Sequence, residues 1–107
     1  MLFSTFVFNL KTDYYSNAAF IFFIVLVSTS LKVATHKEEI LTLLTMKEAL
    51  EILPPQFNRI HKSYIINFDH VELIDTEEVK IKDQRIPIGD LYRDNLFRVI
   101  KNKTSKD

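Results

Sequence analysis

The strongest constraint in this sequence is an uninterrupted apolar run from Ala18 to Val27. A helix that spans a membrane needs about 20 apolar residues, and this run is too short for that. Phe, Ile and Val dominate it, which is typical of a buried strand. Since no polar side chain alternates with the apolar ones, both faces of the strand need to be covered. We therefore predict a core strand over Phe20–Val27, and a membrane-associated or misprocessed segment is the alternative.

The rest of the chain predicts a mainly β domain with two short α-helices. Apolar runs and alternating patterns indicate short strands, and Asp, Asn and Ser mark the turns between them. Pro87 places the last strand at a sheet edge, because proline cannot donate to a ladder. The segment 63–66 is either a strand or a turn that leads into one. The expected strands cover residues 2–10, 31–35, 40–44, 57–60, 63–66, 71–75, 79–82 and 85–88.

Local signals mark both helices. Thr45 and Glu48 have the spacing of a capping box, which predicts a helix from Met46 to about Leu53. The two prolines that follow end this helix, since proline offers no amide donor. Asp90 is expected to cap a second helix over residues 91–100. The spacing predicts that its packed face consists of Leu91, Asn95, Leu96 and Val99.

The composition excludes most kinds of catalytic and metal site. The chain has no Cys and one Gly, so it has no thiolate ligand, no disulfide and no Gly-rich phosphate loop. None of its three His has a ligand-like neighbour four residues on. We therefore expect no enzyme activity, metal, cofactor or small-molecule substrate. The formal net charge is zero, so a nucleic-acid contact would need a local basic patch.

A basic window after the two prolines provides such a patch. Arg59, His61 and Lys62 fall within four positions, and no acid lies between Glu51 and Asp69. Lys62 and Ser63 begin a loop-to-strand transition, where side chains can reach a phosphate backbone. Arg59 has the alternative of pairing with an acid such as Glu51. His61 has the alternative of packing as a hydrogen-bonded core residue, and an ordinary surface lysine is the alternative for Lys62.

The same window resembles a known family. Its pattern Phe57-x-Arg59-Ile60-His61-Lys62-Ser63-Tyr64-Ile65-Ile66-Asn67 is similar to the central signature of the LytTR DNA-binding domain. That domain is the output module of LytR/AlgR-family bacterial response regulators. The blocks 43–54 and 85–93 fit the family in the same order and with similar spacing. The resemblance is good from about Leu31 to Ile100 and poor before that.

The resemblance implies a LytTR-like β-β-β sandwich of short antiparallel sheets. On this interpretation residues 31–101 form the DNA-binding core, and residues 1–30 are diverged N-terminal strands of the same domain. Residues 102–107 are expected to be a disordered tail. The family commonly has an acidic residue at each end of the strand that corresponds to residues 20–27, and this chain has none there.

The resemblance also implies where DNA would be contacted. LytTR domains insert side chains from loops into successive major grooves and do not use a recognition helix. Carried over by position, one contact falls at Ser30, next to Lys32, and a second at Lys62. A third falls in residues 89–93, where Arg93 is the best donor. The family often has a larger polar or aromatic residue at the position of Ser30 and basic residues at positions 90–91, so Ser30, Asp90 and Leu91 weaken the expected phosphate contacts.

The function that we expect is sequence-specific binding of double-stranded DNA in bacterial transcription regulation, in the cytoplasm. The resemblance implies a homodimer on direct repeats, controlled by a receiver domain or a histidine-kinase pathway. The chain is too short for a receiver domain as well, which predicts an orphan regulator, a truncated product or an excised domain. The alternative is a non-catalytic protein-interaction or membrane-associated module with Phe20–Val27 as its adhesive element.

Overall fold

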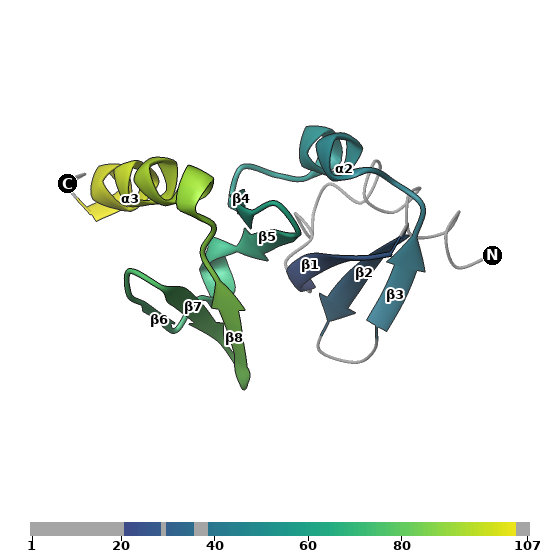
Figure 1. The fold of residues 1–107 in the computed structure, drawn as a ribbon, viewed down its shortest axis with the longest axis horizontal. Coiled ribbons are helices and arrows are strands. Elements are labelled where there is room, and N and C mark those ends of the chain that lie inside the picture. Colours follow the sequence, from purple (N-terminus) through teal and green to yellow (C-terminus); the bar gives the residue numbers. More distant parts are fainter. Residues whose placement is uncertain (1–20, 29, 36–38, 105–107) are drawn as a thin grey trace.

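The computed structural model describes residues 21–28, 30–35 and 39–104, which form two antiparallel sheets and two α-helices (Figure 1). The main sheet has the strand order β3-β2-β1-β5-β4, and the second has the order β6-β7-β8. The helices are α2 (Met46–Ile52) and α3 (Asp90–Thr104). The strands are β1 (Ile21–Val27), β2 (Ser30–Thr35), β3 (Glu39–Thr42), β4 (Phe57–His61), β5 (Tyr64–Asn67), β6 (Leu73–Ile74), β7 (Glu78–Ile81) and β8 (Gln84–Pro87). The predicted mainly β fold is confirmed.

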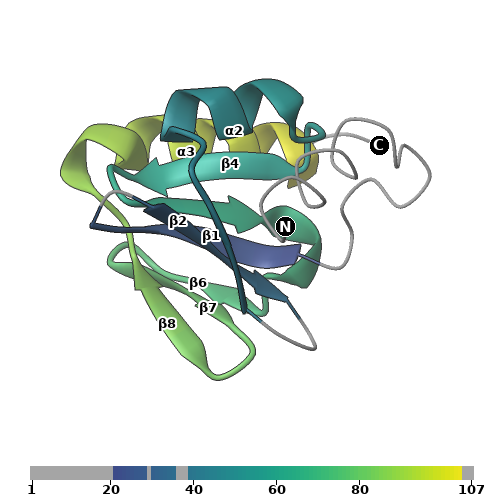
Figure 2. The same ribbon diagram turned by 90° about the vertical axis from the view of Figure 1, so that its right-hand side faces the viewer.

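The main sheet is covered on both faces, so the core consists of two clusters. Both helices lie on the same side of the molecule, next to β4, and the second sheet lies on the opposite side (Figure 2). One cluster lies under α2 and contains Ile21, Ile24, Leu31, Val33, Met46, Ala49, Leu53, Phe57 and Ile65. The other lies between the main sheet, the second sheet and α3, and contains Phe22, Phe23, Ile60, Ile66, Val79, Ile81, Ile86, Ile88 and Leu96.

Strand β1 is central and contributes to both clusters. Its ladder with β2 shifts register between Ile21 and Phe23, which is a β-bulge. The bulge lets Ile21 and Ile24 face the α2 cluster, while Phe22 and Phe23 face the other one. The prediction that both faces of this run are covered is therefore confirmed for its described first half. Near the strand end Leu26 and Val27 are 38% and 46% exposed.

The predicted capping box is confirmed at α2. The Glu48 amide donates to Thr45 Oγ1 at 3.0 Å, and the Thr45 amide donates to Glu48 Oε1 at 2.9 Å. Met46 and Ala49 are the buried residues of this helix. Ala49 brings the backbone close to the sheet, because its side chain is small.

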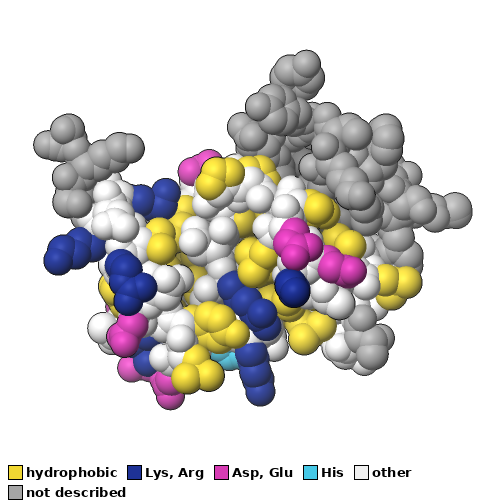
Figure 3. Space-filling view, turned by 90° about the horizontal axis from the view of Figure 1, so that it is seen from above, with side chains coloured by type: hydrophobic (Ala, Val, Ile, Leu, Met, Phe, Trp, Pro, Cys, Tyr) yellow, Lys and Arg dark blue, Asp and Glu magenta, His cyan; other side chains and the backbone are white. Residues whose placement is uncertain are grey.

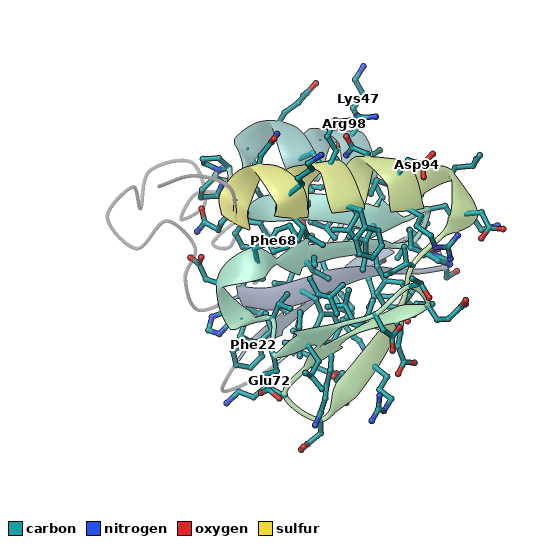
Figure 4. The ribbon with its side chains drawn as sticks, turned by 90° about the vertical axis from the view of Figure 1, so that its left-hand side faces the viewer. Phe22, Lys47, Phe68, Glu72, Asp94 and Arg98 are labelled. Carbon is teal, nitrogen blue, oxygen red and sulfur yellow. The ribbon has the colours of Figure 1, made fainter. Side chains whose placement is uncertain are left out.

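The predicted face of the last helix is wrong in part. Leu96 is buried as expected, but Leu91 is 92% exposed and Asn95 is also exposed. The packed face instead includes Tyr92, Leu96 and Ile100. Figure 4 shows Asp94 and Arg98 on the outer side of α3 and Phe68 beneath its C-terminal half. The helix also begins one residue earlier than predicted and continues to Thr104, so residues 102–104 belong to it and not to the predicted tail.

The second sheet agrees with the alternation in the sequence. Val79 and Ile81 are fully buried, and Pro87 lies in β8, an edge strand. None of the helices in the described part of the chain is long and apolar enough to span a membrane. The strand predicted over residues 2–10 and the tail residues 105–107 lie outside the described residues. So do residues 36–38 of the hairpin loop that the sequence predicts over residues 36–39, whereas Glu39 is the first residue of β3.

A buried asparagine joins β1 to the end of β5. The side chain of Asn67 is fully buried, and its Nδ2 donates to the Ile21 carbonyl at 2.9 Å. Its Oδ1 accepts from the Asp69 amide at 2.9 Å and so caps the short 3-10 turn η1 (Phe68–His70). Asn67 therefore starts the turn at residues 67–70.

We expect the substitution Asn67→Ala to lower the free energy of unfolding by about 2–3 kcal/mol, because it removes the side-chain partner of the buried Ile21 carbonyl and of the Asp69 amide. Urea unfolding measures this loss. The matched control is Asn95→Ala on the exposed side of α3, which should change stability by less than about 0.5 kcal/mol. Equal losses in the two variants would contradict the bridging role of Asn67.

Candidate nucleic-acid interface

Two turns and the start of α3 meet at one end of the molecule. Strand β1 lies between β2 and β5, so the β1–β2 turn and the β4–β5 turn occur at the same end of the sheet. The Leu26 amide donates to the Ser63 carbonyl at 2.8 Å and joins these two turns. The start of α3 lies at the same end (Figure 2). This arrangement brings together Ser30, Lys62, Ser63 and the junction before Arg93.

A bulge in β4 connects α3 to the β4–β5 turn. The ladder between β4 and β5 shifts register between Arg59 and His61, which leaves Ile60 as the extra residue. The Ile60 carbonyl accepts a hydrogen bond from the Gly89 amide at 2.8 Å. A Cβ added at Gly89 would lie 3.3 Å from His61 Cα and 3.2 Å from Tyr92 Cδ2. The single glycine of the chain therefore permits this close approach.

Arg59 stabilises the β4–β5 turn through hydrogen bonds to its backbone. Its Nη2 donates to the Lys62 carbonyl at 2.6 Å, and its Nε donates to the His61 carbonyl at 3.3 Å. The guanidinium carbon lies 5.5 Å from the centre of the Tyr92 ring, which is within cation–π range. Arg59 thus bonds backbone carbonyls in the described structure and does not pair with Glu51. Because carbonyls are neutral, its positive charge is not cancelled.

The side chain of His61 also holds the turn together. Its Nδ1 accepts from the Ser63 amide at 3.0 Å, and its ring packs edge-on against Tyr64 with centroids 5.5 Å apart. This matches the alternative of a packed, hydrogen-bonded histidine. Ser63 is half-buried, and its backbone amide and carbonyl are both bonded. Hydrogen bonds therefore hold both His61 and Ser63 within the β4–β5 turn.

Lys62 is the exposed residue of this turn. Among the described residues, its ammonium has no ion-pair or hydrogen-bond partner. A hollow of about 150 Å³ adjoins it, lined by His61, Lys62, Gly89, Asp90, Leu91 and Tyr92. In the space-filling view, cationic and hydrophobic side chains adjoin along the lower edge of the face (Figure 3). The turn thus presents a free cation next to an open hollow.

Arg93 donates hydrogen bonds to three groups. Its Nε donates to the Thr76 carbonyl at 2.7 Å, its Nη1 to Asp90 Oδ1 at 2.8 Å and its Nη2 to the Ile88 carbonyl at 3.2 Å. The hydrogen bond that Arg93 donates to the Asp90 carboxylate raises the pKa of Arg93. These bonds fix the first turn of α3 against the second sheet. They also leave Arg93 with fewer donors for another ligand.

The turn that supplies the Thr76 carbonyl is itself held by a carboxylate. Asp75 Oδ1 accepts from the amides of Glu77 and Glu78 at 2.7 and 2.8 Å. These backbone hydrogen bonds hold the pKa of Asp75 below its usual value. The chain of contacts from Asp75 through Thr76 to Arg93 therefore links the β6–β7 turn to the start of α3.

The two predicted residues on β2 are close to the site but less available. Lys32 Nζ lies 3.5 Å from Glu39 Oε2, so part of its charge is neutralised within the sheet. Ser30 is half-buried and lies opposite Val27 in the ladder. From β5 to β2 the sheet spans two strand spacings, or about 10 Å. Ser30 therefore lies at the flank of the site, and Lys62 lies nearer its centre.

Sequence reasoning did not assign three residues that shape the site. Gly89 permits the close packing, Tyr92 contacts both Gly89 and Arg59, and Leu91 is left protruding. The sequence did contain a signal for Leu91, because an apolar residue stands at a position where the family often has a basic one. The DNA-contact roles of Ser30, Lys32, Arg59, His61, Lys62, Ser63 and Arg93 stay predictions. Among the described residues, no group of three or more His, Asp or Glu could hold a metal ion.

Comparisons with known proteins agree with the fold described above. The family model of the LytTr DNA-binding domain matches residues 14–101. A similar solved structure is the LytTr DNA-binding domain of a Bacillus cereus protein described as a methyl-accepting/DNA response regulator. The TM-score is 0.73 at 17% identity, and the alignment covers 77% of this chain and 82% of that chain. At this identity the likeness shows the fold alone. No curated protein matches the sequence.

We expect Gly89→Ala to destabilise the protein by about 1 kcal/mol, because overpacking costs more than the chain entropy that alanine saves. The added methyl group would push α3 away from the backbone of His61. Urea unfolding of Gly89→Ala, alone and combined with Tyr92→Ala, measures the cost and its dependence on the Tyr92 ring. A stabilised Gly89→Ala variant would show that α3 is not seated tightly on the turn.

Proposed function

Because this chain belongs to the LytTr DNA-binding domain family, we propose that it binds double-stranded DNA and regulates transcription. The observation that carries the proposal is the hydrogen-bonded β4–β5 turn, which presents the Lys62 cation, without a partner among the described residues, at the end where two turns and the start of α3 meet. Phosphate contacts supply much of the affinity of DNA-binding proteins, and they need such donors on a protruding surface.

Lys62 is the residue that we assign to the DNA backbone. Its turn is held by Arg59, by His61 and by the amide of Leu26, so little chain entropy is lost when Lys62 binds. Ser30 and Ser63 lie at the same end and carry hydroxyl groups that can donate to phosphate oxygens. Arg59 adds positive potential behind the turn. In this proposal Arg59, His61 and Arg93 position the contacts and do not make the main ones.

The mode of binding that fits this arrangement uses turns and not a recognition helix. Helix α3 packs against the core through Leu96 and Ile100, and its first turn lies at the end of the molecule that carries the β4–β5 turn (Figure 2). A major groove is about 12 Å wide and admits a two-stranded β-ribbon. We therefore propose that the β4–β5 turn and the start of α3 enter the major groove and give sequence-specific contacts there.

A single copy offers few free cations at this end. Lys32 is paired with Glu39, and Arg93 is paired with Asp90. A second copy on a direct repeat would double the contacts and raise the apparent affinity. We therefore propose binding as a homodimer on direct repeats, in the bacterial cytoplasm and downstream of a receiver domain or histidine-kinase pathway.

The first test is Lys62→Ala with a duplex that the wild-type chain selects from a random-sequence pool. The loss of one phosphate contact should weaken binding and reduce the slope of log K against log salt by about 1. Mobility shifts at several salt concentrations measure this slope. The matched control is Lys103→Ala at the far end of α3, about 18 Å along the helix from Leu91. Identical slopes for wild type and Lys62→Ala would remove the role of Lys62.

The second test concerns the carboxylate beside Lys62. Asp90→Asn keeps an oxygen acceptor for Arg93 but removes a negative charge from the edge of the hollow. The Asp90 carboxylate would repel a phosphate bound near Lys62, and two unit charges about 7 Å apart in water interact by about 0.6 kcal/mol. We therefore expect Asp90→Asn to tighten duplex binding about threefold at low salt. The gain should shrink as salt rises.

The control for this charge change is Asp83→Asn in the exposed β7–β8 turn, about 20 Å away along β8. It should leave duplex affinity unchanged. An equal gain from both variants would mean that the effect is one of net charge and not of the position of Asp90.

A further inference from the structure

We propose that Leu91 reads the methyl group of a thymine in the major groove, next to the phosphate that Lys62 contacts. This inference rests on the proposed DNA binding and deepens it by naming a residue that determines base preference. The argument depends on the exposure of Leu91, on what surrounds it and on what a DNA duplex offers there.

Leu91 is 92% exposed, which is more than any other large hydrophobic side chain in the described part of the chain. Leu43 and Leu73 follow at 66% and 63%. A single exposed leucine is common on protein surfaces and needs no explanation by itself. The location of Leu91 is what distinguishes it.

Leu91 and Lys62 line the same hollow of about 150 Å³. They come from different elements, α3 and the β4–β5 turn, which the Gly89–Ile60 hydrogen bond of 2.8 Å holds together. An apolar side chain and a free cation therefore project side by side from the end of the molecule that we assign to DNA.

The position of Leu91 relative to Lys62 is rigid. Arg93 bonds the Thr76 and Ile88 carbonyls and Asp90 Oδ1, which fixes the first turn of α3. On the other side, Arg59 and His61 fix the β4–β5 turn. Leu91 and Lys62 therefore project from fixed backbone positions, which limits how far their side chains can shift to adapt to a wrong base.

The chemistry of the major groove leaves one good partner for Leu91. Base edges there present hydrogen-bond donors and acceptors, and the C5 methyl group of thymine is the apolar feature among them. Leucine has no donor for a phosphate or for guanine, whereas it can bury a methyl group. Lys62 at a neighbouring phosphate would set the register in which this contact forms.

Replacement of thymine by uracil tests the contact, because uracil lacks only the methyl group. The duplex is one that the wild-type chain selects from a random-sequence pool, and each thymine is replaced in turn. We expect one thymine per bound copy at which uracil weakens wild-type binding about fourfold, the value for loss of one buried methyl-sized group. In Leu91→Ala, binding to the parent duplex should be weaker, and uracil at that thymine should have less than a twofold effect.

The matched control is Leu73→Ala, which removes the exposed leucine of β6 in the second sheet. It should keep wild-type affinity and the full uracil effect. Undiminished uracil sensitivity in Leu91→Ala, or the absence of any sensitive thymine with the wild-type chain, overturns the role of Leu91 while duplex binding stands. If the wild-type chain selects no duplex at all, the proposed function fails and this inference fails with it.

Discussion

The structure depends on a main sheet that is buried on both faces. The central strand β1 has to supply apolar side chains to two separate clusters, and its bulge near Phe22 distributes Ile21 and Ile24 to one face and the two phenylalanines to the other. Burial on both sides fixes the register of the strands that pair with β1, because a slip of one residue would exchange the faces. That register places Ser63 opposite the end of β1 and so places the β4–β5 turn.

A second bulge, at Ile60 in β4, connects the core to the surface turn. Ile60 is fully buried, and the shift in the β4 ladder frees its carbonyl for the Gly89 amide. The start of α3 is therefore seated on the same turn that the core positions. Bulges are common next to functional sites, where they redirect side chains. Here the bulge joins two segments that lie about thirty positions apart in the sequence.

The parts of the fold that were predictable from the sequence are those set by local or strongly periodic signals. The apolar run indicated β1, and Thr45 and Glu48 marked the start of α2. The phase of α3 was not predictable in this way, because the packing of Tyr92 against Gly89 and Arg59 is non-local. Among the candidate site residues, the exposure of Lys62 followed from its turn. The bond from Arg93 to Thr76 spans 17 positions and ends on a carbonyl, so no pattern of charges revealed it.

The structural roles of Arg59 and Arg93 also explain how a chain with no net charge can present a basic site. Arg59 donates to the Lys62 carbonyl in the turn that borders the hollow, and Arg93 joins the start of α3, which also borders it, to the Thr76 carbonyl. These hydrogen bonds hold the backbone segments from which the side chains of Lys62 and Leu91 project. A site built this way has few free charges for non-specific attraction to phosphates. In the function that we propose, discrimination between DNA sequences comes from the geometry of the groups that remain exposed, and an apolar side chain such as Leu91 beside Lys62 is consistent with it.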